Sequence, residues 1–278
     1  MHILGTVFML PPVQLMCSRT PDPLMCPSLP VGLTAREEGA AEVLQALFGG
    51  TDRAFGRQAM SESEVDAAHP SRGVELTYGE FDLGFFFELL HRANPRKGER
   101  FVDIGSGCGR LVFAAALAHD FELAVGIELL SSLHNMATRT HSSLHDACGD
   151  SVSLAPCRFL CEEVETGLPQ LIPRQRSDAA SDESSDAAIA FVYASCWPSV
   201  GPYLTELSAT LAAALPHGSR VICVDKQLVD SDDASCGLQW RFELLGSLTR
   251  GNYDTGESIG YVYRHSPPSG SAAVANLS

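Results

Sequence analysis

The sequence has no Cys-x-x-Cys pair and little positive charge, and none of its apolar runs approaches the roughly 20 residues that cross a bilayer. Its 19 lysine and arginine residues stand against 34 acidic ones, which gives a net charge of −15. Such a chain repels a phosphate backbone, so direct nucleic-acid binding is not expected. The nine cysteines are scattered, and several lie in apolar runs where reduced thiols pack as small hydrophobes. We predict no membrane association and a reducing intracellular compartment, the nucleus or cytoplasm, with organellar import left open.

The spacing of the histidines completes no metal-ligand set. His134, His141 and His145 could share one helix face, but no cysteine or carboxylate stands where it would add to them. No metal site is predicted, and the three are interpreted as surface histidines.

The chain of 278 residues suffices for one large α/β domain with flanking segments. Residues 1–33 lack the basic start of a secretory signal and contain prolines, which predicts a disordered leader or a transit segment. A helical extension is expected over residues 34–98, a catalytic domain over 99–265 and a disordered tail over 266–278. The acidic stretch 175–186 is interpreted as a solvated loop inserted in that domain.

Two helix signals precede the first strand. Thr34 and Glu37 have the spacing of a capping box, and a glycine pair at 49–50 ends that helix. Residues 79–94 predict a second, buried helix that ends at an Asn-Pro pair.

Strands and helices alternate from Phe101 onward. The expected strands are 101–104, 123–128, 157–161, 188–193 and 220–225, and the expected helices are 110–119, 131–145 and about 203–215. This alternation predicts a Rossmann-like, doubly wound α/β sheet. Two more apolar stretches, Gln239–Leu245 and Ser258–Arg264, are joined by a turn-rich segment and are expected to pair antiparallel at the edge, giving seven strands.

The first strand ends in the pattern Asp-x-Gly-x-Gly-x-Gly, which begins at Asp103. The glycines are Gly105, Gly107 and Gly109. A dinucleotide site would use Gly-x-Gly-x-x-Gly, and Arg110 stands where its third glycine would be. Glu128 ends the next strand, where an acid can hydrogen-bond both ribose hydroxyls.

An acid beside a glycine turn suits a ligand with an ammonium group better than one with a pyrophosphate. S-adenosylmethionine has an ammonium group, a ribose and a sulfonium, and we predict it as the cofactor. NAD or FAD binding and a plain strand-to-helix turn are the alternatives. At the end of the third strand Glu163, or else Glu162, is expected to accept a hydrogen bond from the adenine amino group, unless both are surface carboxylates.

Three segments, "TYGEFDLGFFFELL", "FVDIGSGCGRLV" and "AVGIELL", occur in the order and spacing of a known family. They resemble the catalytic domain of the disruptor-of-telomeric-silencing type (Dot-one-like) histone lysine methyltransferases, over about Thr77 to His265. The resemblance implies a class I methyltransferase fold, S-adenosylmethionine as cofactor and a protein lysine as acceptor. It also implies that Tyr78, Gly79 and Glu80 close over the methionine end of the cofactor.

The chain departs from that family after the fourth strand. An Asn-Asn-Phe-like segment is expected there, whereas this sequence reads Tyr-Ala-Ser-Cys-Trp from Tyr193 to Trp197, and the basic nucleosome-binding segments are missing. The Asn-Pro-Pro-Tyr pattern of amino-directed nucleic-acid methyltransferases is absent too. Tyr78, Tyr193 and Trp197 are expected to line a channel for the acceptor, and Ser195 to orient it by one hydrogen bond. Simple aromatic packing is the alternative for Tyr193 and Trp197.

Together these patterns predict an S-adenosylmethionine-dependent methyltransferase that acts on a protein substrate, through lysine. Two alternatives stay open: a methyltransferase for a small amine or hydroxyl compound, and a non-catalytic module that binds the cofactor. The oligomeric state is left open.

Overall fold

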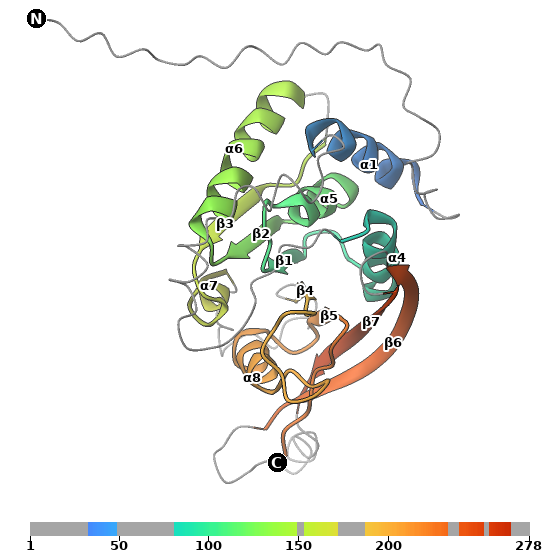
Figure 1. Ribbon diagram of the computed structural model, residues 1–278, viewed down its shortest axis with the longest axis vertical. Coiled ribbons are helices and arrows are strands. Elements are labelled where there is room, and N and C mark those ends of the chain that lie inside the picture. Colours follow the sequence, from blue (N-terminus) through green and yellow to red (C-terminus); the bar gives the residue numbers. More distant parts are fainter. Residues whose placement is uncertain are drawn as a thin grey trace, which may run out of the picture. The chain divides into compact units, whose positions relative to one another are not determined.

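The computed structural model describes residues 33–48, 81–148, 153–171, 187–232, 239–252 and 256–267 (Figure 1). The helices are α1 (Ala35–Phe48), α4 (Leu83–Ala93), α5 (Arg110–Ala118), α6 (Ser131–Cys148), α7 (Val164–Leu171) and α8 (Thr205–Ala214). The strands are β1 (Arg100–Ile104), β2 (Leu123–Glu128), β3 (Cys157–Cys161), β4 (Ala188–Tyr193), β5 (Arg220–Val224), β6 (Arg241–Asn252) and β7 (Gly256–Ser266). The predicted leader, most of the tail and the acidic loop lie outside the described residues.

One seven-stranded sheet, in the order β3-β2-β1-β4-β5-β7-β6, organises the fold. Strands β1 to β5 run parallel, whereas β7 pairs antiparallel with both β5 and β6. The strand order reverses between β1 and β4, which is where open α/β sheets bind their ligands, outside the carboxyl ends of the strands. The α/β prediction, including its antiparallel last strands, is confirmed.

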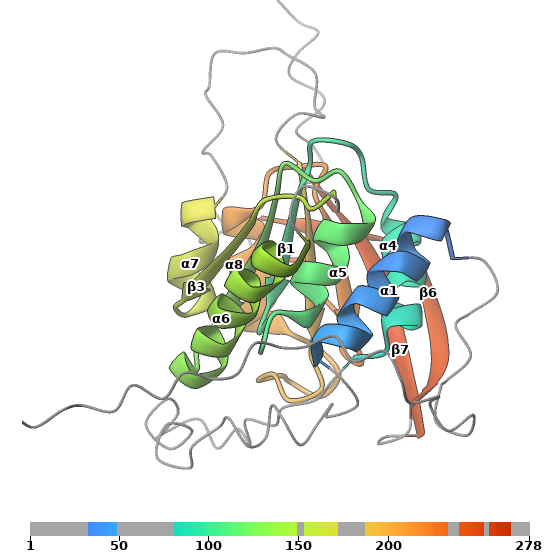
Figure 2. The ribbon, with the colours of Figure 1, turned by 90° about the horizontal axis from the view of Figure 1, so that it is seen from above.

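Helices cover both faces of this sheet (Figures 1 and 2). Helices α4, α5 and α6 share one buried hydrophobic core with one face of the sheet, and α7 and α8 share a second core with the other face. Helix α1 packs on the outside of α5. None of the helices in the described part of the chain has the length and apolar character needed to span a bilayer.

The two N-terminal helices begin where their capping residues place them. The side chain of Glu37 accepts hydrogen bonds from the backbone N–H and the hydroxyl of Thr34 at 2.8 and 2.9 Å, so the predicted capping box forms. Asp82 caps α4 by accepting from the Phe85 N–H at 2.7 Å. Helix α4 lies close against β7, because a Cβ on Gly260 would come within 2.4 Å of Leu89.

Two elements differ from the sequence predictions. Helix α7 was not predicted, since its sequence VETGLPQL contains a glycine and a proline, and both residues disfavour helix. The segment after Leu245 was interpreted as a turn-rich loop, but Gly246–Asn252 continues β6 and stays paired with β7 past a bulge between Leu244 and Gly246. Pairing with an already ordered neighbour outweighs the weak strand propensity of those glycines.

Candidate functional site

The candidate site lies at the carboxyl edge of the sheet, by which we mean the edge where β1 to β5 end. Gly105, Gly107 and Gly109 all have positive φ angles, of 76°, 53° and 84°. At Gly109 the chain also needs space, because a Cβ there would lie 2.6 Å from the ring of Phe159. The turn therefore tolerates only glycine at this position, as the sequence pattern indicated.

Two buried carboxylates border the turn. Asp103, in β1, is 3 % exposed, and Glu128, the last residue of β2, is 8 % exposed. The side chain of Glu128 accepts hydrogen bonds from the Gly107 N–H at 2.8 Å and from the Leu130 N–H at 2.9 Å. The acid predicted to bind ribose therefore also holds the shape of the glycine turn.

The environment of Asp103 disfavours its charge. Burial, and then the nearby negative charge of Glu128, raise the pKa of Asp103 to about 8. Asp103 forms no ion pair with another residue in the described part of the chain. A cationic group beside this carboxylate would favour its ionised form.

These residues fit S-adenosylmethionine. Its ammonium group would pair with the buried carboxylate of Asp103, and its ribose hydroxyls would donate hydrogen bonds to Glu128. Glu128 ends β2 at the glycine turn, where an acid can accept hydrogen bonds from both ribose hydroxyls. The positive φ angles of the turn favour glycine, and glycine places no Cβ between the backbone and a ligand.

The residues predicted after β4 lie beside this turn. Trp197 stands next to the first glycine, because a Cβ on Gly105 would be 3.8 Å from Cζ2 of its indole. Tyr193 packs with the core on the α4 side of the sheet and Trp197 with the core on the α7 and α8 side. Ser195 is exposed, and its hydroxyl lies 3.8 Å from the Cys196 thiol. The roles of Tyr193, Ser195 and Trp197 as acceptor-channel residues remain predictions.

Tyr78, Gly79 and Glu80 lie outside the described residues, but the next residue is well placed. Phe81 is 6 % exposed and packs its ring 5.2 Å from Tyr193. Its carbonyl accepts a hydrogen bond from Arg110, the first residue of α5, at 3.3 Å. The chain that leaves the Tyr-Gly-Glu segment is thus fixed at the carboxyl ends of β1 and β4.

The choice between the two acids after β3 remains a prediction. Glu162 donates its backbone N–H to the Glu128 carbonyl at 3.1 Å, and its side chain accepts from Gln170 at 2.6 Å. Glu163 has an exposed side chain, and its carbonyl accepts the backbone N–H groups of Thr166 and Gly167 as α7 begins. Since the Glu162 carboxylate already accepts a hydrogen bond from Gln170, Glu163 is the preferred candidate of the two.

Sequence reasoning missed two residues that follow β5. Asp225 adopts a left-handed conformation with φ 69°, and its side chain accepts the Ile259 N–H at 3.2 Å. Lys226 donates to the carbonyl of Trp197 at 2.5 Å, which ties the end of β5 to the segment after β4. Neither has a sequence signal: Asp225 meets Ile259 only when β5 pairs with β7, and Lys226 meets Trp197 only when β4 and β5 lie side by side.

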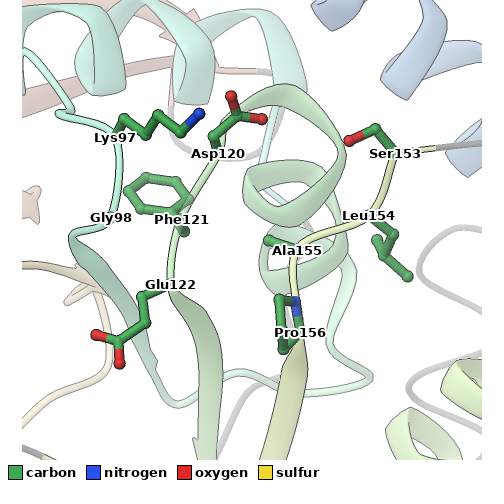
Figure 3. A pocket seen from close by; sticks show the side chains of 9 residues that line it. All are labelled: Lys97, Gly98, Asp120, Phe121, Glu122, Ser153, Leu154, Ala155 and Pro156. Atoms are coloured by element: carbon green, nitrogen blue, oxygen red, sulfur yellow. The ribbon is translucent and has the colours of Figure 1, made fainter.

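A hollow of about 400 Å³ lies elsewhere, at the amino edge of the sheet where β1, β2 and β3 begin (Figure 3). Its lining residues precede those strands: Lys97, Gly98, Asp120, Phe121, Glu122, Ser153, Leu154, Ala155 and Pro156. It contains none of the residues predicted to bind the cofactor. The hollow and the glycine turn are therefore at opposite edges of the sheet.

Comparison with known proteins supports the resemblance. A family model described as "Histone methylation protein DOT1" matches residues 62–151, a span that includes the glycine turn, Asp103 and Glu128. No curated protein matches the chain.

Solved structures give more distant likenesses. An S-adenosylmethionine-dependent methyltransferase from Thiobacillus denitrificans, in complex with S-adenosyl-L-homocysteine, is 19 % identical with a TM-score of 0.36. The likeness covers 59 % of this chain and 55 % of that one, so the chain spans about half the length of that protein. TrmN from Thermus thermophilus is 20 % identical over 66 % of this chain and 48 % of its own, with a TM-score of 0.42. The YcgJ protein from Bacillus subtilis is 12 % identical over 66 % of this chain and 97 % of its own, with a TM-score of 0.40.

The family match falls on the segment that the structure folds into the glycine turn and its two buried acids. It confirms the resemblance seen in the sequence and, with it, S-adenosylmethionine as the cofactor of the fold. Over residues 62–151 the chain is thus similar to the Dot1 family, whose model names histone methylation, and this segment forms part of a seven-stranded α/β sheet of the class I methyltransferase kind.

Proposed function

We propose that this protein transfers a methyl group from S-adenosylmethionine to the ε-amine of a lysine in a protein substrate. The observation that carries the proposal is the position of Trp197 beside Gly105, which brings an aromatic segment from β4 against the glycine turn of β1. The family match, whose description names histone methylation, supports lysine as the acceptor.

When bound, S-adenosylmethionine supplies a methyl group already activated by its sulfonium, so the protein needs little acid-base machinery. Asp103 and Glu128 hold the cofactor by its ammonium and ribose groups. Tyr193 and Trp197, both partly buried, exclude water from the approach of the acceptor. The reaction then depends mainly on holding the two groups close and in line.

A lysine reaches the site protonated, because its ordinary pKa is about 10.4. A dry, aromatic approach disfavours the ammonium form and lowers that pKa. Methyl transfer requires the free lone pair of the neutral amine. Aromatic rings beside the turn therefore suit a lysine acceptor, and the exposed Ser195 hydroxyl can orient it.

The test uses the full chain with S-adenosylmethionine that carries a tritiated methyl group, offered to histones, nucleosomes and a cell lysate. We expect label in protein, and methylated lysine after hydrolysis of the labelled band. Trp197→Leu should lower kcat/KM about fivefold to tenfold, since it removes one aromatic wall, while cofactor affinity stays unchanged. Trp240→Leu is the matched control, because Trp240 lies before β6 and bonds to the Val229 carbonyl.

Label found only in small molecules would contradict the lysine acceptor and favour a metabolite substrate. Cofactor binding with no turnover on any acceptor would favour a non-catalytic module. If Trp197→Leu and Trp240→Leu lower kcat/KM equally, the position of Trp197 beside Gly105 has no special importance for the reaction.

A further inference from the structure

A cluster of one glutamate and two histidines lies away from the glycine turn. Glu37 lies in α1, His91 lies in the last turn of α4, and His119 is the cap residue that follows α5. Each offers one ligand atom, and the three atoms lie within 4.8 Å of one another. Helix α5 begins at the glycine turn, so its 9 residues separate the cluster from that turn by about 13 Å along the helix.

Two atoms in this cluster are buried without a hydrogen bond. Glu37 is fully buried, and its Oε1 accepts none although it lies 2.6 Å from Nε2 of His91. Nε2 of His119, 3.7 Å from the same oxygen, also has no partner. A buried polar atom without a partner costs about 1–3 kcal/mol, so two that face each other call for a ligand between them.

The other carboxylate oxygen of Glu37 already accepts two hydrogen bonds. Oε2 accepts the N–H and the hydroxyl of Thr34 at 2.8 and 2.9 Å. This capping box fixes the carboxylate and directs Oε1 at the histidines. Metal ligands are held in the same way in known sites, by hydrogen bonds from residues that do not touch the metal.

The charges around the cluster favour a divalent cation. A neutral imidazole ring has a lone pair to offer a metal ion, and the Glu37 carboxylate supplies negative charge. Arg36 stands next to Glu37 in sequence, but it donates to Asp120 at 2.6 Å and to the Leu117 carbonyl at 2.7 Å. Its positive charge is thus matched by Asp120.

We propose that Glu37, His91 and His119 bind a zinc ion that joins α1 to α4 and α5. Two histidine nitrogens and one carboxylate oxygen are a common zinc set, with the fourth tetrahedral position filled by water. Ligand atoms about 2.0–2.1 Å from zinc lie about 3.4 Å apart, so the spacing of 2.6 and 3.7 Å needs only small side-chain rotations. Since His91 is exposed and His119 partly so, the ion can enter from solvent.

The site was missed in the sequence because no local spacing marks it. The sequence search considered His134, His141 and His145, which share one helix, whereas these three ligands come from three helices. Only the packing of α1 on α5 brings Glu37 to the histidines.

The experiment measures binding of Zn²⁺ alone, and of Co²⁺ as its visible probe, to the full chain under reducing conditions. We expect one zinc per chain above any bound by cysteines, a raised melting temperature, and a tetrahedral Co²⁺ spectrum without the charge-transfer band of thiolate ligands. His91→Gln and His119→Gln should each weaken this binding at least about 100-fold, and Thr34→Ala about 10-fold.

His217→Gln is the matched control, since His217 is an exposed histidine after α8, and it should bind zinc as the parent does. Far-ultraviolet circular dichroism and retained cofactor binding show that each variant is folded. Zinc binding that is unchanged in the His91→Gln, His119→Gln double variant overturns the proposal, as does a folded parent that takes up none.

Discussion

The two edges of the sheet treat their acidic residues in opposite ways. At the amino edge each acid has a cation: Glu99, 2 % exposed, bonds to Arg220 at 2.5 and 2.7 Å, and Glu122 bonds to Arg100 at 3.1 Å. At the carboxyl edge the buried Asp103 instead faces Glu128, another acid. The acids described at the amino edge are thus paired with basic residues, whereas Asp103 at the carboxyl edge is not.

The pKa directions express the same difference. Hydrogen bonding to Arg36 is the largest cause that lowers the pKa of Asp120, at the amino edge. Burial and the charge of Glu128 raise that of Asp103. The amino-edge acids stabilise the folded chain, whereas ionised Asp103 destabilises it until a cation binds. A buried acid without a cation is thus the mark of a ligand site, and a buried acid with one is the mark of structure.

The largest effect on stability is expected from breaking the amino-edge ion pair. Arg220→Met should lower the free energy of unfolding by about 3–5 kcal/mol, because it leaves the Glu99 carboxylate buried without its cation. It also removes the donors to the Ala93 and Asn94 carbonyls at 2.9 and 3.2 Å. Urea unfolding measures the change. A loss under 1 kcal/mol would show that this pair is no more structural than a surface pair.

A smaller loss is expected from adding a methyl group to the glycine turn. Gly109→Ala meets both a φ of 84° and the Phe159 ring at 2.6 Å, so we expect a loss of about 2–4 kcal/mol and no cofactor binding. Gly98→Ala is the matched control at the amino edge, since Gly98 has the same φ of 84° but nothing within 4 Å. It should lose only about 1–2 kcal/mol, from backbone strain. Thermal and urea unfolding of the pair measure both, and equal losses would contradict the close packing at Gly109.

Neutralising Asp103 should stabilise the protein without cofactor. Below its raised pKa of about 8 the folded chain keeps this carboxyl protonated, whereas the unfolded chain loses the proton above about pH 4. Unfolding therefore releases a proton in that window, and parent stability falls as the pH rises from about 4 to about 8. Asp103→Asn should be more stable than the parent at pH 8 by at least about 1.4 kcal/mol, the free energy of one pKa unit. Melting curves at pH 5, 6.5 and 8 would show the gap widen with pH, and a constant gap would argue against the raised pKa.

The smallest effect is expected at the exposed acid of the amino edge. Glu122→Gln removes one carboxylate that is 56 % exposed and paired to Arg100. Such pairs contribute about 0–1 kcal/mol, so stability and cofactor affinity should both stay near parental values. Urea unfolding and calorimetry check this. A large loss of cofactor affinity would mean that the two edges are not independent.

Much of the fold could be predicted because local patterns determined it. The apolar runs 123–128 and 188–193 match β2 and β4 in their bounds, since buried parallel strands read as continuous apolar runs, and 157–161 matches the partly exposed edge strand β3. Gly246 and Gly251 suggested a turn, yet they lie in β6 because β7 supplies a pairing partner that no local window contains.

The candidate site divides in the same way. The glycine turn, Asp103 and Glu128 are adjacent in sequence to the strands that position them, so a pattern could predict them. The contact of Trp197 with Gly105, the bond from Lys226 to Trp197 and the Glu37, His91 and His119 cluster depend on elements that meet only in the folded chain. No spacing of residues along the sequence predicts these contacts.

The most direct test of the central claim is calorimetric titration of the parent, Asp103→Asn and Glu122→Gln with S-adenosylmethionine. Loss of a hydrogen bond between charged groups costs about 1.5–3 kcal/mol, so Asp103→Asn should bind about 10- to 150-fold more weakly, and Glu122→Gln as the parent does. Parent affinity should rise between pH 6 and 8, by at most about tenfold per unit, while that of Asp103→Asn stays flat. Equal affinity of the parent and Asp103→Asn at pH 8 would contradict the account.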